Sequence, residues 1–374
     1  MSLSKKQRIS ILLLFCLIVF SIIFLKLQRP PQFNILLITI DALRADHLGC
    51  YGYKQNTSPY IDNLTREAAL FTQAISQASW TYPSISSLVT STYPSTHGVY
   101  FWDQDLPDSV PTLPQILKEK DYYTGFISGH GGIPKKVIAR LRRGFDTFDD
   151  IFMAKADEIT QKAALWITDN RNKRFFLWIH YMDLPNSRLD LPEEKLFIEN
   201  ITPAEINTYT LKYDNAIRYV DNQIGIILEK LKVLGLYKNT IIILTADHGQ
   251  QICEHRLCFD HGGFLWESLI KVPLIIFYPK FFFKNKIIIQ QVQHIDILPT
   301  ICGILKIRKS KIFEGRSLLP LISKENVHPT YAFSEHKESK NELSTGELGP
   351  TKLSIRSLEW KLIYTTNRGK TEEY

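Results

Sequence analysis

Four residues in this chain have the types and positions needed to hold a metal ion and attack an ester. They are Asp41, Thr81, Asp247 and His248. Two carboxylates and an imidazole together can bind a divalent metal. A hydroxyl group on such a metal loses its proton more readily, which makes Thr81 a usable nucleophile near neutral pH. The set therefore predicts chemistry on an anionic ester.

Thr81 lies in the stretch SWTYPSISSL, residues 79 to 88, two positions before Pro83. Proline suits the first turn of a helix, and residues 84–91 are expected to form that helix. The N–H groups and the dipole at its start favour an anion bound next to Thr81. A metal, an activated hydroxyl and a helix N-terminus together suit attack on a phosphate or sulfate ester.

Each of these residues also has a purely structural interpretation. Asp41 can cap the helix that follows the first strand, and Thr81 can be a helix N-cap. Asp247-His248-Gly249 can be a turn from strand to loop. The choice between the two interpretations depends on where the fold places the residues.

Apolar runs and helical patterns alternate along the chain and predict an α/β fold. Continuous apolar runs, typical of buried strands in a parallel sheet, occur at 33–40, 175–180, 240–245 and 273–278. Helical patterns occur at 61–69, 112–119, 154–170 and 203–234, the last ending before Gly235. We expect a mostly parallel central sheet with helices on both faces. Ligands of such folds bind beyond the carboxyl ends of the strands, where Asp41 and Asp247 are expected.

The pattern changes after residue 303. The segments YAFSEH, KLSIRS and WKLIYTT are short and strand-like, with polar turns between them, and they predict a small antiparallel β piece. We therefore expect three parts. They are a cytoplasmic tail, membrane anchor and spacer at 1–32, a catalytic α/β domain at 33–303, and a C-terminal β subdomain at 304–374.

The composition is that of a folded protein with a sizeable core. Of the 374 residues, 44% are hydrophobic and 22% are charged, which suits one large domain or a large and a small one. The net charge of +7 is modest, and the basic residues are scattered, with no dense block. A nucleic-acid partner is therefore not expected.

The N-terminal segment predicts attachment to a membrane. Residues 9–25 form a run of seventeen without a charge, which is at the low end for a membrane span. A cleaved signal peptide is the alternative, but no Ala-x-Ala pattern follows the run, so an uncleaved anchor is favoured. Three cations precede the run and two follow it closely. This predicts an N-terminus in the cytoplasm and a catalytic domain outside it.

Two of the five cysteines lie close together. Cys253 and Cys258 have four residues between them. This pair can form a small disulfide loop or remain as two free thiols, and the sequence does not decide between them. A zinc site built from paired Cys-x-x-Cys motifs is not supported, because there is no second pair.

From about residue 33 to the end, the chain carries in this order the segments NILLITIDALRADHLGCYGY, TSPYIDNLTREAALFTQAISQASWTYPSISSLVTSTYPSTHGV, LTADHGQ, HGGFLWESLIKVPLII, QHIDILPT, GRSLLP and WKLIY. These segments resemble the sulfatase family, within the alkaline phosphatase superfamily. The resemblance implies an alkaline phosphatase-like fold and hydrolysis of sulfate or phosphate esters. It implies that Asp41, Asp247 and His248 bind the metal and that Thr81 occupies the position of the nucleophile.

The chain departs from the family at that position and at three others. Sulfatases carry Cys-x-Pro-Ser-Arg and oxidise the cysteine to formylglycine, whereas residues 81–85 here read Thr-Tyr-Pro-Ser-Ile. Threonine is not a formylglycine precursor and Ile85 replaces the arginine, so a formylglycine mechanism is not expected. The other departures are Asp41-Ala42 for an Asp-Asp pair, Gly129-His130-Gly131 for Lys-x-His, and Asp183-Leu184-Pro185-Asn186 where a substrate histidine is usual.

These departures favour a branch of the superfamily that uses one metal and a threonine nucleophile. That branch includes the phosphoethanolamine and phosphoglycerol transferases. The resemblance implies one divalent metal, with zinc or manganese favoured and calcium as the alternative. A phosphotransferase and a non-catalytic binding protein on a sulfatase scaffold are the alternative functions.

Secondary candidates surround this set. His261, near the place of a substrate-contacting lysine in the family, is expected to steady the anion or protonate the leaving group, with a structural loop role as the alternative. His130 and His97 are candidate substrate-binding residues, although a turn role is favoured for His97. Arg44 is a third candidate, and its pairing with Asp46 is favoured over contact with substrate. His180 and His294 are interpreted as core residues or as supports behind the site.

Overall fold

The computed structural model describes residues 33–130, 141–185, 202–256, 258–280, 285–323, 330–338, 351–366 and 370–373. The expected membrane anchor within residues 1–32 lies outside these ranges. Among the described helices, none has both the length and the apolar character that crossing a membrane would require.

A nine-stranded sheet forms the centre of the fold. Its interior strands are runs of Ile, Leu and Phe buried on both faces, as expected for parallel strands covered by helices. In spatial order the main path is β10 (Lys286–Ile288), β2 (Ala69–Ile75), β9 (Lys271–Phe277), β6 (Thr240–Ala246), β1 (Asn34–Ile40), β5 (Phe175–Tyr181), β3 (Tyr123–Ser128) and β4 (Thr147–Asp150). The short strand β11 (Val292–Gln293) also pairs with β2. The predicted α/β fold with a mostly parallel sheet is confirmed.

Strand β9 runs antiparallel to both of its neighbours, β2 and β6. The expectation of a parallel strand at 273–278 is wrong in this respect. The chain between β6 and β9 stays at the carboxyl edge of the sheet, because β7 (Gln251–Ile252), β8 (Cys258–Asp260) and the short helix α10 (Glu267–Ile270) fill the connection. The described residues of this connection include no long crossover helix that carries the chain back to the opposite edge, which a parallel return needs.

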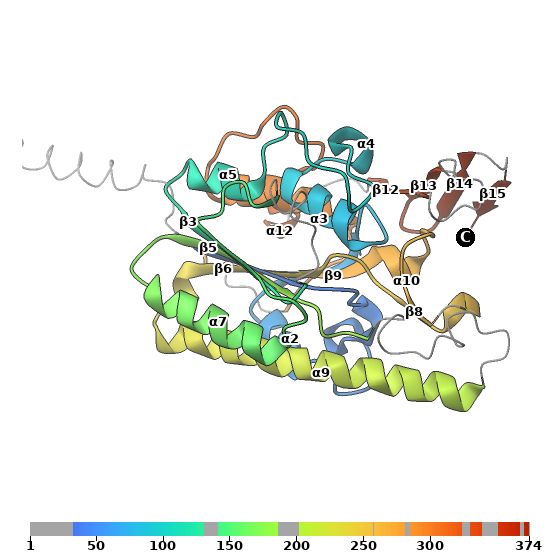
Figure 1. Ribbon diagram of the computed structural model, residues 1–374, viewed down its shortest axis with the longest axis horizontal. Coiled ribbons are helices and arrows are strands. Elements are labelled where there is room, and N and C mark those ends of the chain that lie inside the picture. The colour runs from blue at the N-terminus through green and yellow to red at the C-terminus, as the bar shows by residue number, and fades with distance from the viewer. Residues whose placement is uncertain are drawn as a thin grey trace, which may run out of the picture.

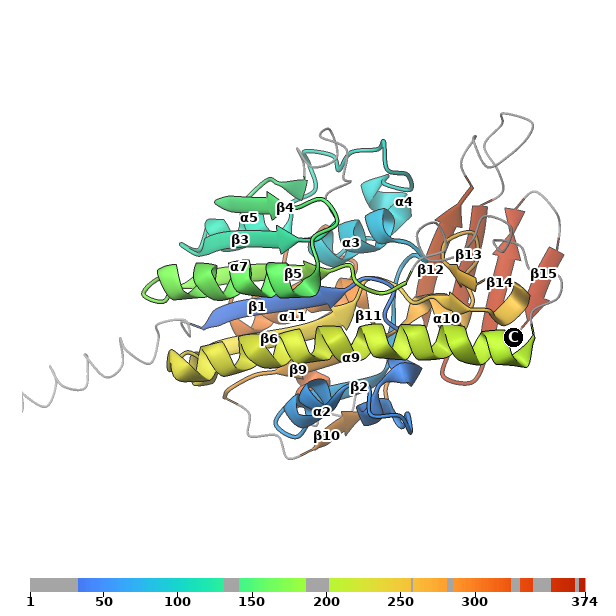
Figure 2. The same cartoon turned by 60° about the horizontal axis from the view of Figure 1, so that its bottom comes forward.

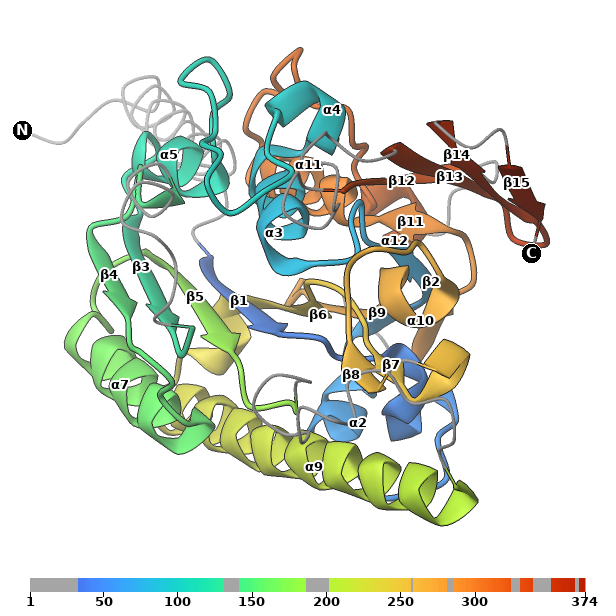
Figure 3. The same cartoon turned by 45° about the vertical axis from the view of Figure 1, so that its right-hand side comes forward.

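Helices cover both faces of the sheet (Figure 1). One face carries α3 (Thr81–Thr90), α5 (Leu113–Lys118) and α12 (Leu319–Ile322), with α11 (Ile297–Ile304) beside α3 (Figure 3). The other carries α2 (Pro59–Thr65), α7 (Ala156–Asp169) and α9 (Pro203–Val233). The remaining helical turns are α4 (Pro94–His97), η1 (Ala45–His47), η2 (Gly49–Tyr51), η4 (Tyr237–Asn239), η5 (Glu254–Arg256) and η6 (His294–Asp296).

The long helix α9 has sequence signals at both ends. Thr202 and Glu205 form a capping box at its start, with the Thr202 hydroxyl accepting from the Glu205 N–H. The predicted stop before Gly235 is confirmed, since Gly235 has a φ of +69°, which glycine adopts without strain.

A separate antiparallel sheet lies near the C-terminus and confirms the predicted β piece. Its strands are β12 (Ala332–Lys337), β13 (Thr351–Arg356), β14 (Lys361–Thr365) and β15 (Lys370–Glu373). It stands beside the central sheet (Figure 2). Strand β12 attaches to the segment after β2, where the Ser334 hydroxyl donates to the Ser76 carbonyl at 2.6 Å and the Glu335 N–H donates to the Gln77 carbonyl at 2.8 Å.

Candidate active site

Asp41, Thr81, Asp247 and His248 meet at the carboxyl edge of the central sheet. Strands β1 and β6 are neighbours in register, so the residues that follow them, Asp41 and Asp247, lie side by side. Helix α3, which starts at Thr81, lies over this part of the sheet (Figure 3). All four side chains are buried. The fold thus assembles the residues that the sequence singled out.

Asp247 has one fixed oxygen and one oxygen without a hydrogen bond. Its Oδ1 accepts the N–H groups of Ala42 at 3.1 Å and His248 at 2.8 Å. Ala42 has a φ of +58°, an uncommon conformation for a residue with a Cβ. The buried Oδ2 has no hydrogen-bond partner in the described ranges and lies 3.4 Å from His248 Nε2. A buried oxygen in this state suits a cation.

His248 places its Nε2 atom near the same oxygen of Asp247. Its Nδ1 lies 2.8 Å from the Gly249 carbonyl oxygen, which can only accept, so Nδ1 carries the proton. Nε2 is then unprotonated and available as a metal ligand. It lies 3.6 Å from Asp41 Oδ1. The ligand atoms of Asp41, Asp247 and His248 all lie within 4.8 Å of one another. We call these three residues the acidic cluster.

Thr81 places its hydroxyl against the acidic cluster. Its Oγ1 lies 3.1 Å from Asp41 Oδ1 and 3.2 Å from His248 Nε2. Helix α3 begins at Thr81, not at residue 84, and the N-cap is Trp80. The interpretation of Thr81 as an N-cap is therefore wrong. Pro83 fits inside the first turn because the first N–H groups of a helix have no intrahelical acceptor.

The pKa shifts of the two aspartates indicate that a bound cation would stabilise the acidic cluster. Burial raises the pKa of Asp247 well above its usual range, and the charge of Asp41 adds to this. Burial also opposes ionisation of Asp41, but His248, His261 and other nearby histidines outweigh it and lower its pKa. A divalent cation would let both carboxylates ionise together. Two carboxylates, an unprotonated imidazole nitrogen and an adjacent hydroxyl are a donor set that fits such an ion.

His261 and His130 also lie at this site. The His261 ring packs against the His248 ring, with 4.5 Å between their centroids. His130 makes an edge contact with the Tyr82 ring at 5.9 Å and lines a small cavity together with Thr81. The structure thus brings both candidates next to the nucleophile position.

Arg44 and His97 do not reach the acidic cluster. The Arg44 guanidinium pairs with Asp46 at 2.7 Å and with Glu254, so the favoured pairing is confirmed and contact with substrate is not. His97 is fully buried, with Nε2 3.0 Å from the Ser87 hydroxyl and Nδ1 accepting the Val99 N–H at 3.1 Å. The favoured turn role fits its position at the end of α4, and His97 is not placed for the alternative contact with substrate.

Residues behind the site hold the start of α3 to the end of β6. The Ser84 hydroxyl donates to the Asp247 carbonyl oxygen at 2.5 Å, and His294 Nε2 lies 3.1 Å from the Thr245 hydroxyl. His294 is thus a support, as predicted. This role of Ser84 was not predicted, although its position in the Thr-x-Pro-Ser motif was a signal.

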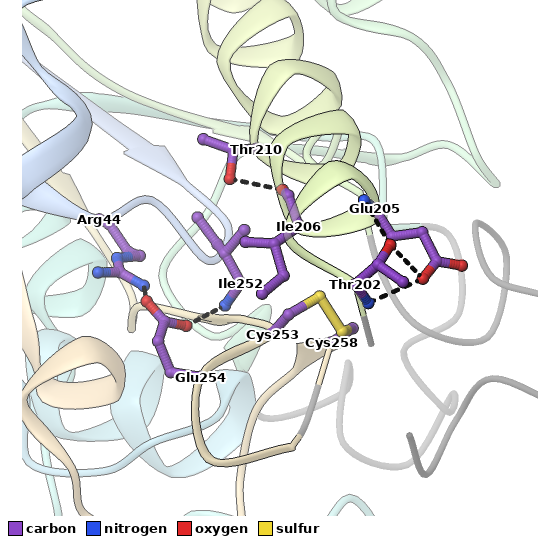
Figure 4. The surroundings of a disulfide bond; sticks show 9 residues. All are labelled: Arg44, Thr202, Glu205, Ile206, Thr210, Ile252, Cys253, Glu254 and Cys258. Carbon is purple, nitrogen blue, oxygen red and sulfur yellow. Dashed lines mark hydrogen bonds and ion pairs between the residues drawn. A yellow bond between two sulfur atoms is a disulfide. The ribbon is translucent and has the colours of Figure 1, made fainter. Parts of the chain in front are cut away.

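Cys253 and Cys258 form a disulfide, which decides between the two alternatives left open by the sequence. It closes the turn between β7 and β8, next to the first turn of α9 (Figure 4). Glu254, inside this turn, accepts from the Ile252 N–H at 2.5 Å and pairs with Arg44. The turn is thereby tied to the segment that follows Asp41.

Two family models and several known proteins match this chain. Residues 33–307 match the family model described as Sulfatase, and residues 253–374 match the C-terminal model of N-sulphoglucosamine sulphohydrolase. An ulvan-active sulfatase of Formosa agariphila is 26% identical over 340 residues, which cover 79% of this chain and 66% of that relative. The chain thus spans about two thirds of that relative's length.

Two solved structures show the same fold. The phosphonate monoester hydrolase SpPMH from Silicibacter pomeroyi has a TM-score of 0.76 at 18% identity, covering 91% of this chain and 88% of that one. BT4656, in complex with its substrate D-glucosamine-2-N,6-O-disulfate, has a TM-score of 0.72 at 20% identity, covering 93% and 91%. Because the Sulfatase model matches most of its length, this chain belongs to the sulfatase family.

Proposed function

We propose that this protein hydrolyses a sulfate or phosphate ester with Thr81 as the nucleophile. The observation that carries the proposal is the position of Thr81 Oγ1, which lies 3.1 Å from Asp41 Oδ1 and 3.2 Å from His248 Nε2. A threonine that only capped a helix would turn its hydroxyl to backbone N–H groups instead.

Each residue of the site has a definite task in this proposal. Asp41, Asp247 and His248 would hold a divalent metal, for which the mixed oxygen and nitrogen donors favour zinc or manganese over calcium. When bound, the ion would act as a Lewis acid that neutralises charge on the reacting group. Asp41 Oδ1 accepts the hydrogen bond of the Thr81 hydroxyl and orients its oxygen for attack.

The reaction proceeds in two steps. Thr81 Oγ1 forms a bond to the sulfur or phosphorus atom while its proton passes to Asp41 Oδ1, and the bond to the alcohol oxygen breaks. His261, next to His248, donates the proton that the departing alcohol oxygen takes up. Water then attacks the sulfur or phosphorus atom and gives a proton to His261, while the bond to Thr81 Oγ1 breaks and this oxygen takes back its proton from Asp41. An acceptor alcohol in place of water would make the same protein a phosphotransferase.

The charges around Thr81 favour a substrate with a single negative charge. Ile85 occupies the place of the family's arginine and is buried, and Arg44 is paired with Asp46 and Glu254. Among the described residues, those that line the small cavity with Thr81 include no lysine or arginine. Sulfate esters and phosphate diesters carry one charge on the reacting group, so we place the substrate in these classes.

We also propose that residues 1–32 anchor the protein in a membrane, with the catalytic part outside the cytoplasm. The uncharged run at 9–25 supports the anchor, and the Cys253–Cys258 disulfide supports an oxidising compartment. Carbonate extraction of membranes tests this, since an anchored protein stays in the pellet and one released into the supernatant contradicts the anchor.

The nucleophile is tested with Thr81→Ala and Thr81→Ser in metal-loaded protein. The substrates are aryl sulfates, aryl phosphate diesters and aryl phosphate monoesters. We expect Thr81→Ala to lower kcat/KM at least about 10³-fold, because it removes the attacking atom, while Thr81→Ser keeps part of the activity. Wild-type protein quenched during turnover should carry the transferred group on the peptide that contains Thr81. Unchanged turnover by Thr81→Ala would exclude this mechanism.

A further inference from the structure

Tyr213 of α9 contacts the turn that follows Asp41. Its hydroxyl donates to the Ala42 carbonyl oxygen at 2.7 Å and accepts from the Arg44 N–H at 2.9 Å. Tyr213 is fully buried, so water does not compete for either bond. Helix α9 lies on the opposite face of the sheet from α3, which carries Thr81 (Figure 1). The turn after Asp41 is thus held from the side of the sheet that faces away from the nucleophile position.

The Tyr213 hydroxyl has one proton, and its two backbone partners decide where that proton points. The Arg44 N–H can only donate, and the Ala42 carbonyl oxygen can only accept. Burial raises the pKa of Tyr213 above its ordinary value of 10, so the hydroxyl is protonated at neutral pH. Tyr213→Phe would therefore remove both bonds and keep the ring, which packs edge to face against His47 at 5.1 Å.

Ala42 is held on both of its sides. Its carbonyl oxygen accepts from Tyr213, and its N–H donates to Asp247 Oδ1 at 3.1 Å. Between these two bonds the residue has a φ of +58°. A residue with a Cβ keeps this left-handed conformation only where its neighbours impose it. Without the Tyr213 bonds we expect Ala42 to relax and to turn its N–H away from Asp247.

The Ala42 N–H fixes one oxygen of a proposed metal ligand. Asp247 Oδ1 accepts this N–H and that of His248, while Oδ2 is buried and has no hydrogen-bond partner in the described ranges. A carboxylate held through one oxygen presents the other in a fixed direction. Hydrogen-bond partners behind a ligand set metal affinity in this way.

We propose that Tyr213 is a positioning residue for the metal ligand Asp247 and that it acts through the strained turn at Ala42. The proposal rests on the proposed function for the presence of the metal. The two bonds of the Tyr213 hydroxyl keep Ala42 in its left-handed conformation. The Ala42 N–H then holds Asp247 so that Oδ2 is free for the ion.

Tyr122→Phe is a matched control for Tyr213→Phe at the other end of β1. The Tyr122 hydroxyl is also buried, and it donates to the Phe33 carbonyl oxygen at 2.8 Å, just before the strand. In isothermal titration with zinc and manganese, we expect Tyr213→Phe to lower affinity at least about tenfold and Tyr122→Phe to change it less than about twofold. Equal affinities in the two variants would overturn the proposal.

The substitution Ala42→Gly tests the route through the turn. Glycine adopts a positive φ without strain, so the turn then depends less on the Tyr213 bonds. The double variant Ala42→Gly/Tyr213→Phe should therefore regain part of the affinity that Tyr213→Phe loses. If Tyr213→Phe lowers affinity by the same factor in the Ala42→Gly background as in wild type, the route through Ala42 is wrong.

Hydrogen exchange in the metal-free protein adds a measurement that needs neither metal nor turnover. Tyr213 does not bond to the Ala42 N–H itself. Tyr213→Phe should nevertheless speed the exchange of this N–H at least about tenfold relative to that of Leu37 in the same strand. Tyr122→Phe should leave this ratio unchanged. An unchanged ratio in Tyr213→Phe would mean that Tyr213 does not hold the turn.

These measurements distinguish the role of Tyr213 from that of Thr81. If Thr81→Ala leaves turnover unchanged but Tyr213→Phe loses metal affinity, the proposed nucleophile fails and the positioning role stands. If Thr81→Ala is inactive and Tyr213→Phe binds metal like wild type, only the positioning role fails. A wild-type protein that binds neither ion would overturn the positioning role together with the proposed metal site.

Discussion

His248 Nδ1 lies 2.8 Å from the carbonyl oxygen of Gly249, its own neighbour in the chain. This short contact decides which nitrogen of the ring is free to face Asp41, Asp247 and Thr81. The backbone after β6 is therefore part of the site. Residue 249 has no space for a side chain, because a Cβ at this position would lie 2.0 Å from the Ser268 carbonyl oxygen.

Gly249→Ala should accordingly weaken metal binding by moving the turn that orients His248. We expect at least about a tenfold loss of metal affinity, in the range seen when outer partners of metal-binding histidines are removed. Isothermal titration with zinc and manganese measures it. Gly235→Ala is the control, since it carries only the strain of a φ of +69° and meets no atom within 4 Å. Equal affinities in the two variants would contradict the role given to Gly249.

Asp247→Asn should separate metal binding from folding. The asparagine Oδ1 can keep the N–H bonds from Ala42 and His248, and the unfavourable burial of an ionisable carboxyl group disappears. We expect the metal-free variant to be at least as stable as wild type. Metal at about 100 times the wild-type Kd should stabilise wild type by about 2.7 kcal/mol and the variant by much less.

Thermal unfolding with metal and with a chelator gives both quantities for Asp247→Asn. Asp46→Asn serves as the control, because Asp46 pairs with Arg44 outside the acidic cluster. If metal raises the unfolding free energy of Asp247→Asn as much as that of wild type, Asp247 is not a metal ligand.

His97 should make the protein sensitive to acid. Burial lowers its pKa to about 3, below the value of 6.5 of an ordinary histidine. Between these values the unfolded chain binds a proton that the folded chain does not, so unfolding free energy is lost as pH falls from 6.5. The slope from this residue is about 1.4 kcal/mol per pH unit.

His97→Asn should be less stable than wild type at pH 7, because the contact with Ser87 is weakened. The variant should then lose less unfolding free energy as the pH falls, so that the unfolding free energies of the two proteins converge toward pH 4. Urea unfolding at several pH values measures the difference. A stability gap that is constant from pH 7 to 4 would mean that His97 accepts a proton in the folded state.

The disulfide should contribute to stability through the unfolded chain. Cys253 and Cys258 are five positions apart, and closing so short a loop is worth about 2 kcal/mol in the chain-entropy description. The double variant Cys253→Ser/Cys258→Ser should lose this amount in urea unfolding. A reductant should lower the unfolding free energy of wild type to that of the double variant, and it should leave the unfolding free energy of the variant unchanged. A reductant effect of equal size in both proteins would point instead to other thiols.

The centre of the sheet and the main residues of the site could be predicted from sequence. Strands β1 and β6 are unbroken apolar runs, each followed closely by an aspartate, and neighbouring parallel strands bring such residues together. Thr81 was found through its distance from Pro83. These signals are local, so they did not depend on knowing the rest of the fold.

Features that depend on contacts between distant segments were not predicted. The helix expected at 61–69 ends at Thr65, and Ala69 begins β2, because pairing with β9 decides the conformation there. His180 is buried, as its interpretation as a core residue or support predicts, but its position on the wall of the cavity beside Thr81 was not predicted. Its position at the end of an apolar strand was a visible signal, but the cavity forms from residues of β3, β5 and α3 together.

The register of β1 against β6 also bears on how the protein is made. The Ala42 N–H and the Asp247 carboxylate that it binds are 205 residues apart in the chain. A nascent chain on the ribosome therefore cannot capture a metal ion with this set of ligands until β6 has emerged and paired with β1. Metal uptake would mark the completion of folding, and fragments that end before β6 would lack the affinity altogether.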